Sequence, residues 1–337
     1  MINEIVVSKH FKCILLTSKS DGFLSTLQNK NLLHYRLFYK WYDLNILTFF
    51  SLIITQIQIF LFVLFRTNKN DIIYINTILP FSVYLASIIS KRQIVNHIHE
   101  DMNLNKLLYK FIKKIYLKYN QHSIFVSKYI KSVTPNPNNS IVVYNNIKDH
   151  TLKSKIEIDK RDYILMISSL KLFKGIDTFI SLAKESPENN FVLVLSSELE
   201  QIDSFLKKNQ LYISKNLKIF PIQKKIDYFY SKAYITLVLT KPNEWIETFG
   251  LTILESFSHG TPVIAPNYGG PIELIAHGQD GYLIDDVSNK TLIRQTINDF
   301  LIDKKNMILF SDNSRKKYLK FQKENSYNQI TTYLKNI

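Results

Sequence analysis

The sequence is poor in residues that cross-link a chain or interrupt its regular structure. Its 337 residues include one cysteine, eight glycines and nine prolines. The single cysteine, Cys13, cannot form an intramolecular disulfide bond, which excludes a secreted scaffold held together by disulfides. It also excludes structural zinc held by four cysteines, or by two cysteines with two histidines. Residues 1–12 lack the long apolar core of a signal peptide, so the cytoplasm is the expected compartment.

Length and composition favour two globular domains. At 337 residues and 39.6 kDa the chain is about twice the usual length of a single domain. With 46% hydrophobic and 21% charged residues, wholesale disorder is excluded. Short apolar runs alternate with longer amphipathic ones, which is typical of βαβ units and a parallel sheet. The predicted strands are 13–17, 72–76, 93–98, 123–126, 141–144, 163–167, 191–195, 217–220, 234–239 and 262–265.

We therefore expect an α/β fold of two doubly wound, Rossmann-like domains. The first would span residues 1–150 and the second residues 151–337, with a junction near residues 148–160 and a last helix that can cross back to the first domain. In such folds ligands bind beyond the carboxyl ends of the strands, so the loops that follow strands should carry the chemistry.

The positive charge of the chain is concentrated in its first half. Residues 1–150 hold 18 Lys/Arg against 7 Asp/Glu, whereas residues 151–337 hold 25 against 21. A basic half favours a polyanion or an anionic membrane surface as partner. No RNA- or DNA-binding motif is present, and the basic residues are not joined to an aromatic stacking platform, so nucleic acid is not expected.

Two segments bear on membranes. Residues 46–65 are long enough to cross a bilayer, but they contain polar residues and a strand is predicted shortly afterwards. The alternatives are a spanning helix and a largely buried or surface-seated helix. Residues 106–119 place five lysines at helical spacing with apolar residues opposite. This helix can lie on anionic headgroups, or its apolar face can simply pack on the sheet; we favour contact with the membrane surface.

The most informative stretch is residues 247–284, ETFGLTILESFSHGTPVIAPNYGGPIELIAHGQDGYLI. A helix is predicted to begin just beyond a strand and to end near Ser258. Its first backbone amides and partial positive charge suit a phosphate, and Gly250 lets a phosphate approach the backbone. Glu247 in the loop and Glu255 in the helix stand at different levels, so one can reach a sugar hydroxyl and the other a ribose.

Purely structural interpretations of this stretch remain open. Thr252 and Glu255 have the spacing of a capping box, and Glu247 near a helix start is favourable on dipole grounds alone. The run Gly269-Gly270-Pro271 can be only a turn.

The stretch nevertheless resembles a known family. Glu247 and Glu255, with seven residues between them in ETFGLTILE, look like the E-x7-E motif of family 4 retaining glycosyltransferases, enzymes of polysaccharide and lipopolysaccharide synthesis with the GT-B fold. The resemblance continues in order through HGTPVIAP, NYGGPIELI and GQDGYLID. It reaches back to SSLKLFKGIDTFISLA at residues 168–183, and so covers most of the second half.

The resemblance implies two domains facing across a cleft, with a nucleotide-sugar held mainly by the second. It implies that Lys174 neutralises the donor diphosphate, Glu255 binds the nucleotide ribose and Glu247 the hydroxyls of the donor sugar. It further implies that backbone amides face the phosphates or the sugar at Gly250, Leu251 and Thr252.

The first half resembles the family more loosely. His99, just past a predicted strand, resembles the histidine that related enzymes place against the donor sugar, and His97 competes with it for this role. Ser169 stands where the family usually has an arginine, which removes one contact to the diphosphate unless Lys171 swings in. The opening strand and glycine-rich loop of the family are also missing, which implies a shortened first domain. Either the chain starts late or its own N-terminal residues complete the sheet.

The sequence thus predicts a retaining glycosyltransferase that moves a sugar from a nucleotide-sugar, UDP- or GDP-linked, to a glycan or lipid-linked acceptor in surface polysaccharide synthesis. We expect no cofactor and no metal, since the sequence lacks an Asp-x-Asp motif and Lys174 with helix amides would hold the diphosphate. We expect the protein in the cytoplasm, peripheral on the inner face of the plasma membrane and bound through its basic half. The alternative is a truncated, non-catalytic relative that acts as a partner or scaffold.

Overall fold

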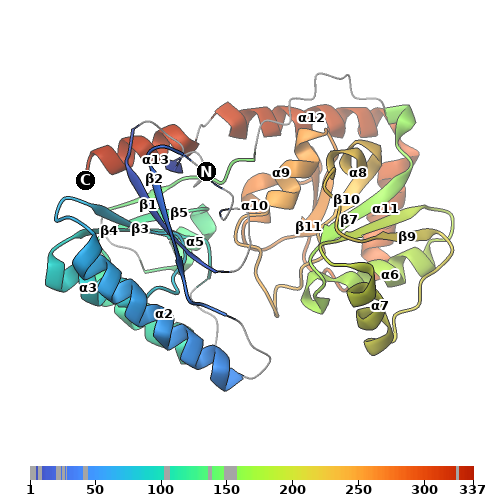
Figure 1. The fold of residues 1–337 in the computed structure, drawn as a ribbon. Helices are drawn as coiled ribbons and strands as arrows, with labels where there is room; N and C mark the ends of the chain where they lie inside the picture. Colours follow the sequence, from blue (N-terminus) through green and yellow to red (C-terminus); the bar gives the residue numbers. More distant parts are fainter. Residues whose placement is uncertain are drawn as a thin grey trace. The chain divides into compact units, whose positions relative to one another are not determined.

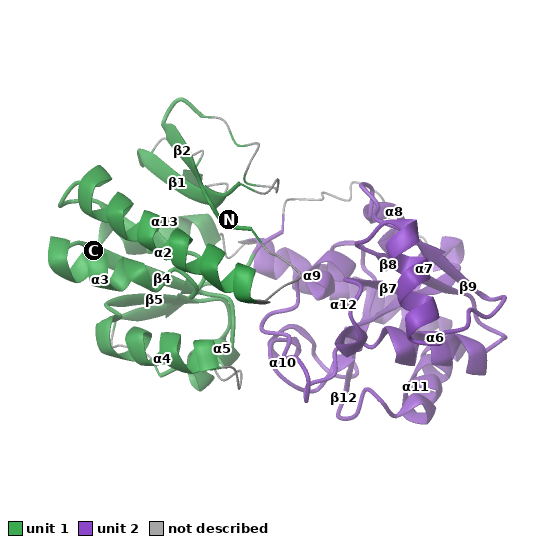
Figure 2. Cartoon of the chain, turned by 60° about the horizontal axis from the view of Figure 1, so that its bottom comes forward, with its two compact units in different colours: residues 1–145, 325–337 green, residues 146–324 purple. Residues whose placement is uncertain are grey.

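The computed structural model describes residues 5–6, 10–19, 24, 27, 29–40, 45–101, 107–135, 139–147, 158–323 and 326–337. The chain forms two compact units, shown in different colours in Figure 2. Unit 1 comprises residues 1–145 and 325–337, and unit 2 comprises residues 146–324. The junction predicted near residues 148–160 falls mostly outside the described residues, as does Lys106, the first residue of the predicted basic helix.

Unit 2 contains a six-stranded parallel sheet with the strand order β12-β11-β10-β7-β8-β9 (Figure 1). Its strands are β7 (Tyr163–Ser168), β8 (Phe191–Leu195), β9 (Leu217–Phe220), β10 (Ala233–Leu237), β11 (Val263–Pro266) and β12 (Gly281–Ile284). Its longer helices are α6 (Ile176–Glu185), α7 (Leu199–Lys208), α8 (Asp227–Lys232), α9 (Leu251–Ser258), α11 (Lys290–Ile302) and α12 (Lys304–Lys323).

Both faces of this sheet are covered, which explains why its strands are almost wholly apolar. The five residues of β8, FVLVL, are all buried. Alternate residues of β7 and β8 pack with α6, α7 and α11 on one face, and with α8 on the other. Continuous apolar runs are expected wherever helices cover both faces of a parallel sheet.

The strand order fixes where a ligand can bind. Counted along the chain within unit 2, the order is 6-5-4-1-2-3, so the direction of winding reverses between β7 and β10, which pair in parallel. The loops after these two strands diverge to opposite sides and leave a crevice at their carboxyl ends.

Within its described residues, unit 1 contains two separate parallel sheets. The larger has the order β3-β4-β5-β6 and the smaller pairs β1 with β2. The strands are β1 (Cys13–Ser18), β2 (Leu32–Leu37), β3 (Ile72–Ile75), β4 (Gln93–Ile98), β5 (His122–Phe125) and β6 (Ser140–Val142). Its helices include α2 (Asn45–Arg66), α3 (Ser82–Ser90), α4 (Leu107–Tyr119), α5 (Lys128–Val133) and α13 (Ser326–Lys335).

The C-terminal helix α13 belongs to unit 1. Ile330 and Leu334 are buried in a cluster with Val95 of β4 and Ile124 of β5. The hydroxyl of Tyr333 donates to the backbone oxygen of Asn139 at 2.9 Å.

The structure contains two strands that are not among those predicted from the sequence, and the sheet of unit 1 is divided in a way that was not expected. β2 and β12 were not predicted; β12 is four residues long, and β2 contains His34 and Arg36 among its leucines. In the described part of the chain no strand joins β1 to β3, so the single doubly wound sheet expected for the first half is two sheets instead. A mostly apolar cavity of about 1160 Å³ lies against both β1 and β3.

Candidate functional site

Unit 2 has a pocket at the point where its sheet reverses direction. The pocket has a volume of about 200 Å³. It is formed by the ends of β7 and β10 and by side chains from the segments that follow them. Its lining residues are Met166, Ile167, Ser168, Ser169, Lys174, Leu237, Val238, Leu239, Thr240, Glu247 and Thr252.

Lys174 is placed in this pocket by a short 3-10 turn, η3 (Leu172–Lys174), that follows β7. The next residue, Gly175, has a φ of 81° and packs against the segment that follows β10, since a Cβ there would lie 2.3 Å from the backbone oxygen of Leu239. Only glycine fits both the dihedral angle and the close approach. The turn therefore holds the Lys174 ammonium group at the crevice.

Lys174 and Glu247 form an ion pair inside the pocket. Lys174 Nζ donates to Glu247 Oε2 at 2.8 Å, and each side chain is 22% exposed. Thr240 Oγ1 lies 3.4 Å from the same carboxylate oxygen. The cation and the carboxylate, which the family resemblance assigns to different parts of a donor, are thus direct neighbours.

The Gly269-Gly270 pair holds the Glu247 loop from one side. The Gly270 N–H donates to the backbone oxygen of Glu247 at 2.7 Å. A Cβ on Gly269 would lie 2.6 Å from that oxygen, and one on Gly270 would lie 2.4 Å from Phe249 Cα. The pair is therefore more than a turn, because its missing side chains allow the two backbone segments to touch.

Three contacts hold the same loop to the turn that carries Lys174 and to α6, the helix that follows this turn. The rings of Trp245 and Phe173 stack, with centroids 5.4 Å apart. The Lys241 N–H donates to the backbone oxygen of Phe173 at 2.8 Å, and Lys241 Nζ pairs with Asp177 at 2.7 Å. Lys174 and Glu247 are consequently fixed relative to each other by backbone as well as side-chain contacts.

Helix α9 begins at the pocket. Its N-cap is Gly250, with a φ of 106°, and Thr252 in its first turn lines the pocket. The amides of Leu251 and Thr252 lie in the first turn, where a helix supplies no carbonyl oxygen to accept their hydrogen bonds. They also lie at the positive end of the helix dipole. The capping-box interpretation is wrong, because Thr252 is the second residue of the helix rather than its N-cap.

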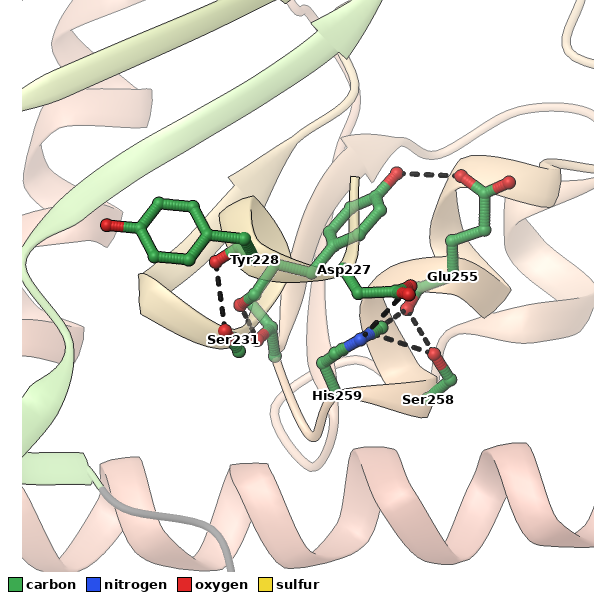
Figure 3. Close-up of polar contacts among 8 residues, drawn as sticks. Asp227, Tyr228, Ser231, Glu255, Ser258 and His259 are labelled. Atoms are coloured by element: carbon green, nitrogen blue, oxygen red, sulfur yellow. Dashed lines mark hydrogen bonds and ion pairs between the residues drawn. The ribbon is translucent and has the colours of Figure 1, made fainter. Parts of the chain in front are cut away.

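Glu255 lies one turn further along α9 and is positioned by a buried tyrosine (Figure 3). Tyr230 of α8 donates its hydroxyl to Glu255 Oε2 at 2.8 Å. Burial, followed by the nearby carboxylate, raises the pKa of Tyr230 well above its usual value, so the hydroxyl remains a donor. The Tyr230 ring stacks on His259, whose Nε2 lies 3.4 Å from Asp227. Nothing in the sequence around Tyr230 marked it as a partner of Glu255.

We predict that Tyr230→Phe weakens nucleotide binding while leaving turnover largely intact. Without the hydroxyl, the Glu255 carboxylate loses the bond that orients it. The dissociation constant for a nucleoside diphosphate should rise by about three- to tenfold, the net contribution of one ordinary hydrogen bond, because Tyr230 acts on the ligand only through Glu255. Calorimetry would measure it. Tyr228→Phe is the matched control, because this neighbouring tyrosine is 61% exposed and should leave the affinity unchanged. Equal affinities for both variants and the wild type would contradict the role of Tyr230.

Ser169 and Lys171 occupy different positions with respect to the pocket. Ser169 is exposed and lines it, together with Lys174. Lys171 is also exposed but is not among the lining residues. The proposal that Lys171 replaces the family's arginine therefore requires its side chain to reorient when the donor binds.

His99 belongs to unit 1, so the unit 2 pocket is built without it. It follows β4, and its Nε2 lies 3.0 Å from Asn76 Oδ1. His97 is buried beside it, with ring centroids 4.2 Å apart, and its Nδ1 lies 2.7 Å from the Tyr74 hydroxyl. Burial lowers the pKa of His99 to about 4, so the imidazole is neutral near pH 7 and suits hydrogen bonding rather than charge pairing.

Comparison with solved structures identifies the fold class. Anabaena HepE, whose structures include one with UDP and glucose and one with UDP-glucose, superposes with a TM-score of 0.78 at 17% identity, covering 100% of this chain and 95% of that one. Sucrose-phosphate synthase from Thermosynechococcus elongatus gives a TM-score of 0.71 at 15% identity, covering 96% and 88%. These likenesses confirm the predicted GT-B fold class.

Sequence comparison shows the family. Sucrose synthase from Melioribacter roseus is 25% identical over 179 residues, which are 48% of this chain and 22% of that protein. A potato sucrose synthase is 54% identical over 39 residues, 12% of this chain and 5% of that one. The chain thus spans less than a quarter of the length of these relatives. The family model described as glycosyl transferases group 1 matches residues 148–317, half of the chain. The chain therefore belongs to the glycosyl transferases group 1 family.

Proposed function

We propose that this protein transfers a sugar from a nucleotide-sugar to a glycan or lipid-linked acceptor, with retention of configuration and without a metal, in surface polysaccharide synthesis. One observation carries the proposal: the Lys174 ammonium group and the start of α9 meet in one pocket at the switch point of unit 2. Both are positive, and together they suit the charge that develops on a departing diphosphate.

The Lys174–Glu247 ion pair would rearrange when the donor binds. Lys174 would turn to a diphosphate oxygen, and the Glu247 carboxylate would accept hydrogen bonds from the sugar hydroxyls. The pair is partly exposed, so solvent screens it and it costs little to separate. In the free protein it holds both side chains near the positions that the donor requires.

Retention follows if the acceptor attacks on the face from which the diphosphate leaves. The acceptor oxygen would bond to the anomeric carbon as the bond to the diphosphate oxygen breaks, and a phosphate oxygen would take the acceptor proton. Glu247 then positions the sugar and stabilises positive charge on its ring, and forms no covalent bond. His99 would hydrogen-bond the donor sugar in its neutral form.

The donor can be identified by its effect on thermal unfolding. A ligand at about 100 times its dissociation constant stabilises the folded state by about 2.7 kcal/mol, enough to raise the melting temperature by several degrees. We expect one nucleotide-sugar of a UDP- and GDP-linked panel to do so, and the HepE complexes with UDP and UDP-glucose make UDP-hexoses the first to test. No shift with any nucleotide at millimolar concentration would favour the non-catalytic scaffold instead.

Turnover should not depend on a divalent metal. Lys174 and the α9 amides would supply the positive charge that Mg²⁺ or Mn²⁺ supplies to a diphosphate elsewhere. Adding EDTA in excess should leave the rate of sugar transfer unchanged within about twofold, whereas a Lewis-acid metal would contribute several kcal/mol. Loss of activity with EDTA, restored by one divalent ion, would overturn this part of the mechanism.

We also propose that the protein works at the cytoplasmic face of a membrane, bound through its basic first half. The exposed lysines of α4, Lys110, Lys114 and Lys118, recur every fourth residue and so share one side of the helix. Each basic residue near an anionic bilayer contributes about 1 kcal/mol. A lipid-linked acceptor would be reached most readily from that surface.

A further inference from the structure

Helix α2 is amphipathic in the opposite sense to an ordinary surface helix, because its polar side chains face the protein. Ser51, Thr55 and Gln56 are buried. Ser51 Oγ accepts from the Lys40 N–H at 2.8 Å, and Thr55 Oγ1 donates to the Phe38 oxygen at 2.5 Å. These bonds attach the helix to the segment that follows β2.

A second pair of polar side chains completes this attachment. Gln56 Oε1 accepts from the Ser82 N–H at 3.1 Å, and its Nε2 donates to the Leu79 oxygen at 3.2 Å. Gln58 Oε1 accepts from the Phe38 N–H at 2.9 Å. The glutamines that argue against a spanning helix in the sequence therefore hold α2 on the surface of unit 1.

The opposite side of α2 exposes large apolar side chains. Six of them recur at intervals of three or four residues and so form one stripe. They are Ile46 (61% exposed), Phe50 (56%), Ile54 (43%), Ile57 (54%), Leu61 (46%) and Phe65 (76%). An 18-residue stretch within residues 46–66 has a mean hydropathy of 2.2, and only 28% of that stretch is buried.

The neighbouring helix α3 adds to this surface. It packs alongside α2 (Figure 1) and exposes three further apolar side chains, Leu85, Ile88 and Ile89. We call the six residues of α2 and these three residues of α3 the α2–α3 face. A soluble protein seldom exposes so many large apolar groups together without a partner.

The charges around the α2–α3 face are almost all positive. Arg66 and Lys69 at the end of α2 and Lys91 at the end of α3 are exposed. Between residues 45 and 99 the sequence has a single acidic residue, Asp71. The Phe81–Phe111 ring contact, with centroids 5.5 Å apart, joins the start of α3 to the lysine-bearing helix α4.

We propose that the α2–α3 face lies in the plane of an anionic membrane leaflet, with its apolar side chains among the upper acyl chains. Its cationic rim, formed by Arg66, Lys69 and Lys91, would lie on the headgroups. This inference deepens the membrane association in the proposed function and rests on it. Apolar insertion combined with cationic flanks is the chemistry of interfacial helices. A second copy of the chain would bring the same positive rim against this one, whereas anionic lipid complements it.

Vesicle flotation tests the proposal directly. The probe is vesicles of phosphatidylcholine with about 30% phosphatidylglycerol, mixed with the full chain at low salt and at about 1 M NaCl, where the Debye length is about 3 Å. Since apolar insertion is not screened, part of the wild type should stay bound at high salt. Ile57→Glu/Leu61→Glu should lower the partition coefficient at least about tenfold. Ile57→Gln/Leu61→Gln, which adds no charge, should also lower it.

Control variants separate the surface from general effects. Ile302→Glu/Tyr212→Glu changes two exposed apolar residues of unit 2, 82% and 78% exposed, and should bind vesicles like the wild type. Phe65→Trp should show fluorescence quenched by lipids brominated in their acyl chains. Complete release at high salt without quenching would overturn the insertion, and would leave contact through the lysines alone.

Other occupants of the surface give other results. A dimer that Ile57→Glu/Leu61→Glu converts to a monomer, without vesicle binding by the wild type, would overturn the proposal in favour of a second copy. Resistance to alkaline carbonate extraction would overturn it in favour of a spanning helix. Nucleotide binding measured without vesicles separates the two proposals: if it is absent while vesicle binding persists, the catalytic function fails and this surface assignment stands.

Discussion

Lys174→Ala is expected to lower kcat/KM for sugar transfer by about 100- to 1000-fold, the effect of removing one preorganised charge contact to a developing anion. Lys174 is the cation that η3 and Gly175 hold in the unit 2 pocket, 2.8 Å from Glu247. Its removal leaves a carboxylate facing the diphosphate, so donor binding and turnover should both suffer.

Two controls isolate this effect. Lys184→Ala removes an exposed lysine at the end of α6, outside the pocket, and should behave like the wild type. Lys174→Arg keeps the charge and should recover part of the loss, since a guanidinium group can also bind a phosphate. Kinetics of Lys174→Ala within about threefold of the wild type would mean that the diphosphate is held elsewhere, because that factor corresponds to less than 1 kcal/mol.

Glu247→Gln should separate turnover from nucleotide affinity. The amide keeps the shape of the side chain but loses its negative charge, so it cannot stabilise positive charge on the sugar ring. We expect kcat to fall by about 10- to 100-fold, a loss of transition-state stabilisation. The affinity for the nucleoside diphosphate should stay the same or increase, because Lys174 loses its competing ion pair.

The matched control for this variant lies in the same loop. Glu244→Gln changes an exposed carboxylate that does not line the pocket, and both kcat and affinity should remain those of the wild type. An unchanged kcat for Glu247→Gln, or an equal fall of kcat for Glu244→Gln, would contradict the role of Glu247 in the reaction.

Part of the backbone geometry of the unit 2 pocket could be predicted because its determinants are local in sequence. Gly250, followed by an apolar helix after a strand, marks a helix start at a sheet edge, and the structure places α9 there. The turn at Lys174 and Gly175 was expected from the family resemblance of residues 168–183, and the structure has η3 there. Motifs of this kind fix backbone dihedral angles, and those angles are what bring the groups together.

The parts that could not be predicted depend on contacts between segments distant in sequence. Tyr230 reaches Glu255 across 25 residues, and its own segment shows only an amphipathic turn. The packing of Gly270 on Phe249 is likewise invisible to residue patterns. The separation of β1 from β3 in unit 1 depends on strand pairing, which apolar runs alone do not specify.

Helix α2 shows a further limit of pattern analysis. Its apolar run favours a core or membrane helix, and its polar residues are too few to indicate which side is buried. Only the bonds from Ser51, Thr55 and Gln56 to backbone groups reveal that the polar side faces inward.

The central claim is that Lys174 and the start of α9 bind the diphosphate, and calorimetry with two ligands tests it most directly. The nucleoside diphosphate selected by the thermal panel is compared with its monophosphate, for the wild type and for Lys174→Ala. We expect the wild type to prefer the diphosphate by about tenfold or more, as for a charge-assisted contact, and the variant to lose most of that preference. Equal preference in both proteins, or no binding of either ligand by the wild type, would contradict the claim.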